Sequence, residues 1–328
     1  FLKNRIGITA TYWDRTNKDF PLSVGVSPYT GYTTVNTNAG EVKKTGIDIQ
    51  LFLNPIRSKN LEWTINGTWG RLLKNDVISI NDELNIQRIT TEAGGNGNIN
   101  LVSEKGQRWG QLRGTAIKRI NGQPVLRSDG IYEREQNVNF GSSLPDYTGG
   151  VQNTFTLFKN FLVNINVDFS YGGKFFSLSD WYGSGTGLTA RTAGMNDRGI
   201  PIRDAVADGG GIHVFGVDGT GKAVDYYVEA RDYFEQNGLY SQGIVEESLR
   251  DLTFVKLREF SLGYKVPVSK LGIGKYVKNA VFSVVARNPW LIYSAGKGFD
   301  PSELSNNSGE DGQFPGTRSL GFNLKLGF

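Results

Sequence analysis

Alternation of apolar and polar residues is the strongest pattern along the chain. In residues 161–171, apolar side chains occupy every second position from Phe161 to Tyr171, and the positions between them carry Asn164, Asn166, Asp168 and Ser170. Successive side chains of a β-strand point to opposite faces, so the segment predicts a strand with one apolar and one polar face. Its length of about ten residues is that of a strand tilted across a lipid bilayer.

The same alternation recurs along the rest of the chain. The other segments that show it are 6–12, 45–54, 61–72, 149–158, 253–265, 277–292 and 318–328. Within 253–265 the apolar positions shift near Arg258 and Glu259, which predicts a β-bulge. Two further strands, 107–119 and 123–133, are predicted around Asn121-Gly122, a dipeptide typical of hairpin turns. The total is about ten strands.

Short and long connections between these strands alternate. The short ones are 54–60, 159–160 and 266–276, and the long ones are 15–40, 73–106, 173–252 and 293–317. Outer-membrane barrels have short periplasmic turns and long outer loops. We therefore predict an all-β, antiparallel transmembrane β-barrel whose last strand ends on the periplasmic side. The alternation allows zero or two strands within 73–148, and we predict two; residues 224–234 are predicted as a short helix or a turn-rich lid.

Composition excludes several classes of protein. The 328 residues carry a formal net charge of +4, no cysteine and one histidine, His213. Disulfides, thiolate metal sites and sites with several histidines are therefore excluded. No block of Lys and Arg suggests nucleic-acid binding. No stretch of about 18 apolar residues predicts a membrane-spanning helix, but barrel strands do not need one.

The first residues suggest a piece of a longer protein. Residues 1–5 show no Met start, charged leader or cleavage site, and alternation begins at residue 6. We interpret residues 1–328 as the C-terminal part of one barrel domain, without its plug and N-terminal strands. An open sheet edge leaves backbone polar groups unpaired in lipid, so further strands should pair with the edges of this sheet.

No motif predicts an enzyme or a metal site. Gly216–Lys222 (GVDGTGK) fits most of a phosphate-binding loop, but Ala223 replaces the expected Ser or Thr and no strand–helix context surrounds it, so a glycine-rich loop is favoured. His213 has no partner at a recognisable spacing and is expected at the surface. Five acidic residues could bind calcium or serve a glycosidase, although solvated loop charges are favoured: Asp197, Asp204, Asp208, Glu310 and Asp311.

Aromatic residues are the candidates for binding. Five of them in 173–252 could contact substrate or a lid, or else pack the loops together: Trp181, Tyr182, Phe215, Tyr226 and Tyr227. At the other end of the chain, Phe322, Leu324, Leu326 and Phe328 line one face of the last strand. Such a strand ending in an aromatic residue looks like the signal that barrel-assembly machinery recognises.

Several motifs resemble the C-terminal half of SusC/RagA-type TonB-dependent outer-membrane transporters. Residues 38–48 (NAGEVKKTGID) are similar to the family's NAGE…NKGVE, and 63–77 to its W…N…KNxV. Residues 144–150 (LPDYTGG) resemble PDxxxG, and 253–267 (TFVKLREFSLGYKVP) resemble FVKLRxxxLGYxLP. Residues 286–301 resemble RNxxL…DPE, with Ser302 in place of Glu, and 315–328 match the closing strand. The motifs follow the family's order through nearly the whole chain.

The resemblance implies a barrel of about 22 strands with an N-terminal plug. It also implies a SusD-like surface lipoprotein as a lid, TonB as the source of energy, and glycans or peptides as cargo. One alternative is a SusC-type barrel that acts as a scaffold in a larger outer-membrane assembly. The other is a soluble β-sandwich enzyme or lectin, which would be extracted without detergent.

Overall fold

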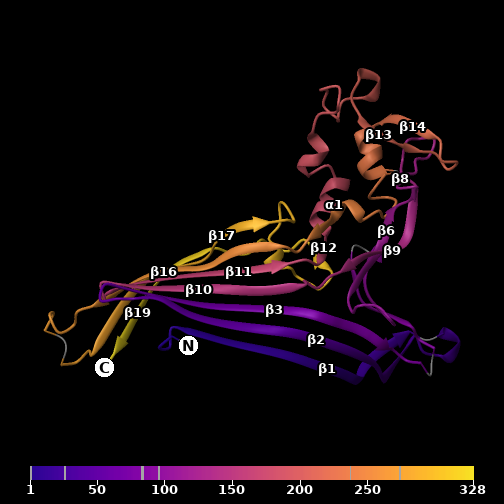
Figure 1. Ribbon diagram of the computed structural model, residues 1–328. Helices are drawn as coiled ribbons and strands as arrows, with labels where there is room; N and C mark the ends of the chain where they lie inside the picture. Colours follow the sequence, from indigo (N-terminus) through magenta and orange to yellow (C-terminus); the bar gives the residue numbers. More distant parts are fainter. Residues whose placement is uncertain (1, 26, 83–84, 95–96, 237, 273–274) are drawn as a thin grey trace.

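The computed structural model describes residues 2–25, 27–82, 85–94, 97–236, 238–272 and 275–328, so Phe1 lies outside it. Eight strands form one antiparallel sheet in the order β1-β2-β3-β10-β11-β16-β17-β19 (Figure 1). Their bounds are β1 Ile6–Gly25, β2 Thr34–Arg57, β3 Leu61–Ser79, β10 Tyr147–Leu157, β11 Phe161–Tyr171, β16 Phe254–Val266, β17 Asn279–Ser294 and β19 Ser319–Gly327. The sheet is open, with β1 and β19 at its edges.

Three connections of the sheet, 80–146, 172–253 and 295–318, carry the remaining strands and most of the helices. We call them together the loop body. Its strands are β4 Arg88–Gly94, β5 Ile99–Glu104, β6 Gln111–Ile117, β7 Arg119–Ile120, β8 Gln123–Pro124, β9 Arg134–Ser142, β12 Lys174–Ser177, β13 Ile212–Val217, β14 Ala223–Val228, β15 Leu249–Asp251 and β18 Gly309–Glu310. Its helices are α1 Leu178–Gly185, η3 Ala190–Ala193, η4 Val206–Asp208, η5 Asp232–Gln236, η6 Glu246–Ser248 and η7 Pro301–Glu303, and η1 Pro28–Thr30 joins β1 to β2.

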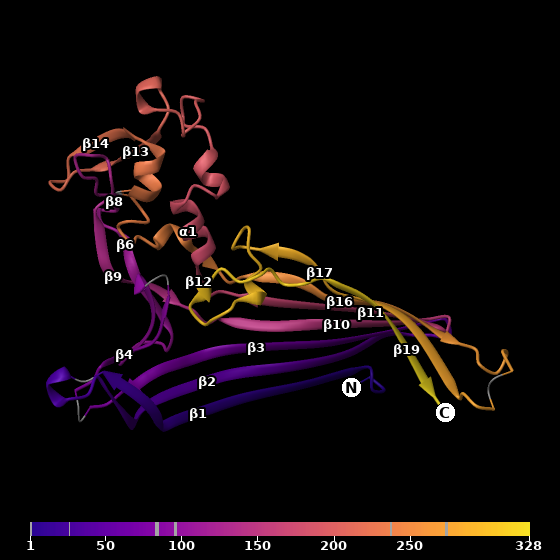
Figure 2. The same cartoon turned by 180° about the vertical axis from the view of Figure 1, so that it is seen from behind.

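The loop body stands at one end of the sheet, and the short turns and the C-terminus lie at the other (Figures 1 and 2). This separation matches the predicted order of short and long connections. None of the helices within the described ranges has the length and apolarity needed to cross a membrane.

The strand register keeps the apolar positions on one face of the sheet. Val163 lies opposite Phe155 and Leu262, and Leu262 lies opposite Val284. The polar positions share the other face, where Asn164 donates a hydrogen bond to Ser261 (3.1 Å). Large apolar side chains stay exposed on the first face: Leu262 is 46% and Phe322 76% exposed. The face therefore has the character of a surface that meets lipid.

Aromatic side chains cluster at both ends of this apolar face. Near the loop body, Tyr147 stacks on Tyr171 with ring centroids 4.8 Å apart. Near the short turns, Phe161 lies 5.0 Å from Tyr264. Ten residues separate the belts along β11, and at about 3.3 Å per residue and about 40° of tilt they span about 25 Å along a membrane normal. Girdles at this spacing are typical of transmembrane barrels.

The predicted bulge near Arg258 is confirmed. Asn166 lies opposite Glu259 and Val167 opposite Leu257, so Arg258 is the extra residue in β16. A second irregularity follows in β17, where Asn288 adopts a positive φ of 48°. Pairing of β17 with β19 stops at Arg287, so Pro289, which has no N–H, lies beyond the paired part of that edge.

The predicted strands at 45–54, 61–72, 149–158, 161–172, 253–265, 277–292 and 318–328 all belong to the sheet. The predicted connection 15–40 is wrong, because β1 continues to Gly25 and β2 begins at Thr34. The two membrane strands predicted at 107–119 and 123–133 are also wrong. Asn121 and Gly122 do form a hairpin turn, with φ of 51° and 81°, but it joins the short strands β7 and β8. β3 pairs directly with β10, so none of the described residues between them forms a strand of the sheet.

The short helix predicted at 224–234 is present only at the end of that range. Residues 224–234 form β14, which pairs with β13, and the start of the π-helix η5. Most of the buried apolar side chains lie in the loop body, and one of its clusters contains Ile99, Leu112, Phe176, Trp181 and Val245. This cluster joins the first and second connections into one packed unit.

Candidate functional site

The loop body is tied to the polar face of the sheet by its third connection, residues 295–318, which we call the strap. Lys256 of β16 points to this face, and its side chain is only 3% exposed. Its ammonium donates to Asp300 Oδ2 (2.7 Å), Glu303 Oε1 (2.9 Å) and Ser302 Oγ (3.0 Å). All three acceptors belong to the strap, so a cation of the sheet holds a turn of this connection.

Arg258, the bulge residue, strengthens this attachment. Its Nε donates to Asp168 Oδ2 of β11 (2.6 Å), and one terminal nitrogen donates to Glu303 Oε1 (3.3 Å). Glu303 therefore accepts hydrogen bonds from both Lys256 and Arg258. Lys256 and Arg258 lie within a family motif, but no pattern in the sequence predicts a site there; the available signal was two cations close together near the start of the strand.

The far part of the strap is attached to the rest of the loop body. Glu310 accepts hydrogen bonds from Ser179 N (2.7 Å) and Ser179 Oγ (2.9 Å) at the first turn of α1, where a carboxylate is favoured by the helix dipole. Phe176 pairs with Gly309, which joins the strap to β12. Glu92 of β4 accepts from Ser308 N (2.9 Å). The strap thus connects the sheet to both other connections.

A second network of charges lies inside the loop body. Asp180 Oδ2 of α1 forms ion pairs with Arg250 (2.7 Å) and Arg191 (3.2 Å) and accepts a hydrogen bond from Ser248 Oγ (2.8 Å). Arg191 also reaches Glu247 (2.9 Å). Burial raises the pKa of Glu247 despite Arg191. The network fixes the start of α1 against η6 and η3.

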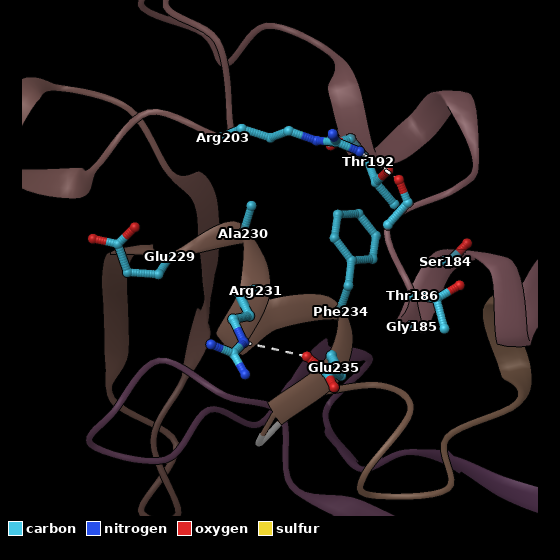
Figure 3. A pocket seen from close by; sticks show the side chains of 11 residues that line it. Ser184, Gly185, Thr186, Thr192, Arg203, Glu229, Ala230, Arg231, Phe234 and Glu235 are labelled. Atoms are coloured by element: carbon cyan, nitrogen blue, oxygen red, sulfur yellow. Dashed lines mark hydrogen bonds and ion pairs between the residues drawn. The ribbon is translucent and has the colours of Figure 1, made fainter.

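A pocket of about 560 Å³ opens beside the other end of α1 (Figure 3). Figure 3 shows the Phe234 ring near its centre, Arg203 on one side and the ion pair of Arg231 and Glu235 on the other. Arg203 donates to Thr192 O (2.6 Å). Ser184 and Gly185 of α1 complete the wall next to Phe234. The pocket offers both signs of charge and an aromatic floor to a polar ligand.

His213 is not isolated as the sequence suggested. Its Nδ1 lies 2.8 Å from Asp197 Oδ2, and its Nε2 lies 2.7 Å from Asp225 Oδ1. The imidazole stacks on Tyr227 with ring centroids 4.6 Å apart, and the Arg198 guanidinium covers that ring at 3.4 Å. The hydrogen bond to Asp225 is the main reason that the pKa of His213 is raised, and that to Asp197 adds to it. The imidazolium form joins the segment 197–198 to the hairpin β13–β14.

The five predicted aromatic residues do not form one surface. Trp181 is buried and donates its indole N–H to Ile244 O (2.8 Å). Tyr227 is covered by His213 and Arg198, and Tyr226 is half-buried against Gly130. Tyr182 and Phe215 are 50% and 67% exposed. A role in contacting substrate or a lid stays a prediction, and Tyr182 and Phe215 are the members with accessible rings.

The other motifs have local structural roles. Gly216–Lys222 spans the end of β13 and the turn before β14, where Asp218 accepts from Thr220 N (2.8 Å) and Lys222 N (3.1 Å). This is a hairpin turn, as the glycine-rich loop interpretation expected. Within the described ranges, no three His, Asp or Glu side chains are grouped so that they could hold a metal ion. Calcium in the outer loops stays an untested hypothesis.

Comparisons with known proteins agree with this architecture. No family model matches the chain. It is similar to the TonB-dependent receptor P26 of Formosa agariphila, with 23% identity over 348 residues that cover 97% of this chain and 32% of that protein. It is also similar to a chain of the RagAB peptide transporter, with a TM-score of 0.66, 17% identity, and coverage of 98% of this chain and 33% of that one. For the RagAB peptide importer in its "open-open" state, the TM-score is 0.63 at 16% identity, with coverage of 99% and 33%.

The chain therefore spans about a third of the length of the proteins that it matches. The structural likeness shows the fold, and the matched names are those of a receptor and of transporters, not of enzymes. Together they support the resemblance to SusC/RagA-type TonB-dependent transporters.

Proposed function

We propose that the chain is a fragment of a SusC/RagA-type TonB-dependent transporter and forms one wall and the outer loops of an outer-membrane importer. The observation that carries the proposal is the sheet itself. Its apolar face has aromatic belts about 25 Å apart, its opposite face is polar, and the packed loop body stands at one end only. Strands from the rest of the protein complete the barrel, because an open edge is not stable in lipid.

In this proposal the C-terminus lies on the periplasmic side. This orientation is supported by the short turn 158–160, which lies at the same end of the sheet as the C-terminus (Figure 1). Short turns lie on the periplasmic side of outer-membrane barrels. Gly199 in the loop body and Gly272 in a short turn both have open space around them, so each tolerates an inserted epitope. In the full-length protein on intact cells, antibody should label the epitope at 199 and should reach the one at 272 only after lysis. Labelling of the epitope at 272 on intact cells would reverse the orientation.

The partners follow from the same orientation. The loop body is the part that contacts a SusD-like surface lipoprotein and the cargo, a glycan or a peptide, and TonB acts through a part of the protein outside this chain. The full-length protein should be purified from its native membrane in detergent. Co-purification of a single SusD-like lipoprotein supports import. A stable complex of many proteins without it contradicts import and favours a scaffold, and extraction by buffer alone contradicts both.

The last strand fits a role in assembly. Phe322 on the edge strand β19 is 76% exposed, and Phe328, the residue that follows the strand, is 84% exposed. We expect Phe328→Ser to reduce the amount of heat-modifiable, folded barrel in membranes severalfold, because the strand would lose the terminal aromatic residue that the assembly machinery recognises. Asn323→Ser, on the polar face of the same strand, is the matched control. An equal loss in both variants would contradict a specific signal.

A further inference from the structure

The attachment of the strap to β16 has an unusual physical chemistry. Lys256 carries a positive charge with almost no contact with water, since its side chain is 3% exposed. An ammonium in such a place is stable only if it is paired and its donors are satisfied. Lys256 has three donors, and Asp300, Ser302 and Glu303 supply one acceptor each. Removing the cation would leave two partly buried carboxylates without their main partner.

The strap presents these acceptors in a prearranged form. Asp300 precedes η7 and caps it, because its Oδ1 accepts from Ser302 N (3.1 Å) and Ser302 Oγ (2.7 Å). Burial opposes ionisation of this carboxyl, but the hydrogen bonds from Lys256 and Ser302 outweigh it and lower its pKa. The Asp300 carboxylate therefore stays charged at neutral pH, and its ion pair with Lys256 is not broken by protonation there.

The contact of Lys256 with Asp300 and Glu303, which we call the lock, joins two parts of the molecule. Lys256 and its neighbour across the strands, Asp168, belong to the polar face, and Arg258 joins Asp168 to the strap. The other half of the strap is bound through Glu310 to α1 and through Ser308 to β4. The strap therefore crosses from the polar face of the barrel wall to the loop body with both ends fixed.

We propose that Lys256 is a positioning residue that locks the strap over the polar face, so that residues 295–318 form a fixed wall at the outer end of the barrel interior. Without the lock the first half of the strap loses its main attachment to the polar face and becomes more mobile. That this interior is a passage for cargo rests on the function proposed above, but the lock itself does not. Its test therefore uses no transport measurement, and its failure is distinct from a failure of the proposed function.

The first measurement is limited proteolysis of the full-length protein in detergent. Trypsin can cut the strap after Lys297 and Arg318, both of which are exposed. We expect Lys256→Met to increase the rate of cleavage at these two sites at least tenfold, and Lys256→Arg to restore part of the protection. Lys265→Met is the matched control, since Lys265 lies on the same strand, is exposed and has no side-chain partner among the described residues. Its strap should be cut at the wild-type rate.

The second measurement reads the strap directly. Phe314 is 96% exposed, and the chain has no cysteine of its own, so Phe314→Cys accepts a nitroxide spin label in the strap. The label should become more mobile when Lys256→Met is added and should not change with Lys265→Met. If Lys256→Met gives no heat-modifiable barrel, Glu303→Gln replaces it and should increase strap cleavage about two- to fivefold. The proposal is overturned if folded Lys256→Met, or failing that Glu303→Gln, leaves strap cleavage within twofold of wild type and the label unchanged, or if Lys265→Met releases the strap equally.

Discussion

The sheet and the loop body use opposite arrangements of the same residue types. In the sheet, large apolar side chains such as Leu262 and Phe322 are exposed, and polar ones face each other on the opposite side. In the loop body, Leu112, Phe175 and Val245 have no exposed surface. Strand β6 is buried on both faces, as in the core of a water-soluble protein. The sheet thus leaves its apolar face exposed, whereas the loop body buries its own apolar side chains.

The largest effect should come from the core of the loop body. Leu112→Ala removes a fully buried side chain from the cluster around Ile99 and Phe176, which costs about 2–5 kcal/mol. Near-UV circular dichroism in detergent should show the loop body unfolding at lower temperature, while the heat-modifiable barrel remains in gels. Leu262→Ala, on the exposed face, is the control. Simultaneous loss of loop body and barrel would show that the two regions are not separate in stability.

The next effect tests which face of the sheet meets lipid. Ile165→Arg places a charge on the apolar face and should destabilise the full-length barrel in vesicles by about 2–4 kcal/mol. Asn166→Arg places the same charge on the polar face of the same strand and should change the free energy of unfolding far less. Urea unfolding followed by tryptophan fluorescence measures both. Equal costs would contradict the assignment of the faces.

The smallest effect should be the pH dependence of the hairpin β13–β14. The pKa of His213 is raised in the folded state, so its stabilising contribution is complete below the unfolded value of about 6.5 and is lost as pH rises through the folded pKa. The hydrogen bond from Tyr227, together with that of His213, lowers the pKa of Asp197, so its contribution is lost only in acid, below about pH 4.

Hydrogen exchange of residues 212–228, corrected for the intrinsic rate, measures this dependence. Protection should be greater at pH 6 than at pH 9, and His213→Gln should remove the difference. A difference that persists in His213→Gln would assign the pH dependence to other groups.

The sequence predicted the sheet better than the loop body, and the reason is physical. Alternation reports that one face of a strand is apolar, so it identified β11 and even the Arg258 bulge. It did not show that β1 continues to Gly25, because residues 14–19 (DRTNKD) are polar at every position and interrupt the alternation. It misassigned residues 107–133, because strand β6 is buried on both faces and shows no membrane-type alternation.

The candidate site was hidden for a different reason. Lys256 meets Asp300 and Glu303 only after the strap has folded back from β17, and no local pattern encodes such a contact. His213 gains Asp225 through the register of a hairpin in which it lies opposite Tyr227. The family motifs did contain Lys256, Arg258 and Asp300, but motifs name positions without stating which of them touch.

The strap also bears on the order in which the molecule folds. It is the link between β17 and β19, whereas β10 and β11 are joined by the short turn 158–160. Each doubling of the length of a flexible loop adds about 0.6 kcal/mol to the entropic cost of bringing its ends together. Fixing the strap at Lys256 shortens the free chain that must close before β19 can pair. We expect β19 to join the sheet last, after the strap has bound to Lys256 and to the loop body.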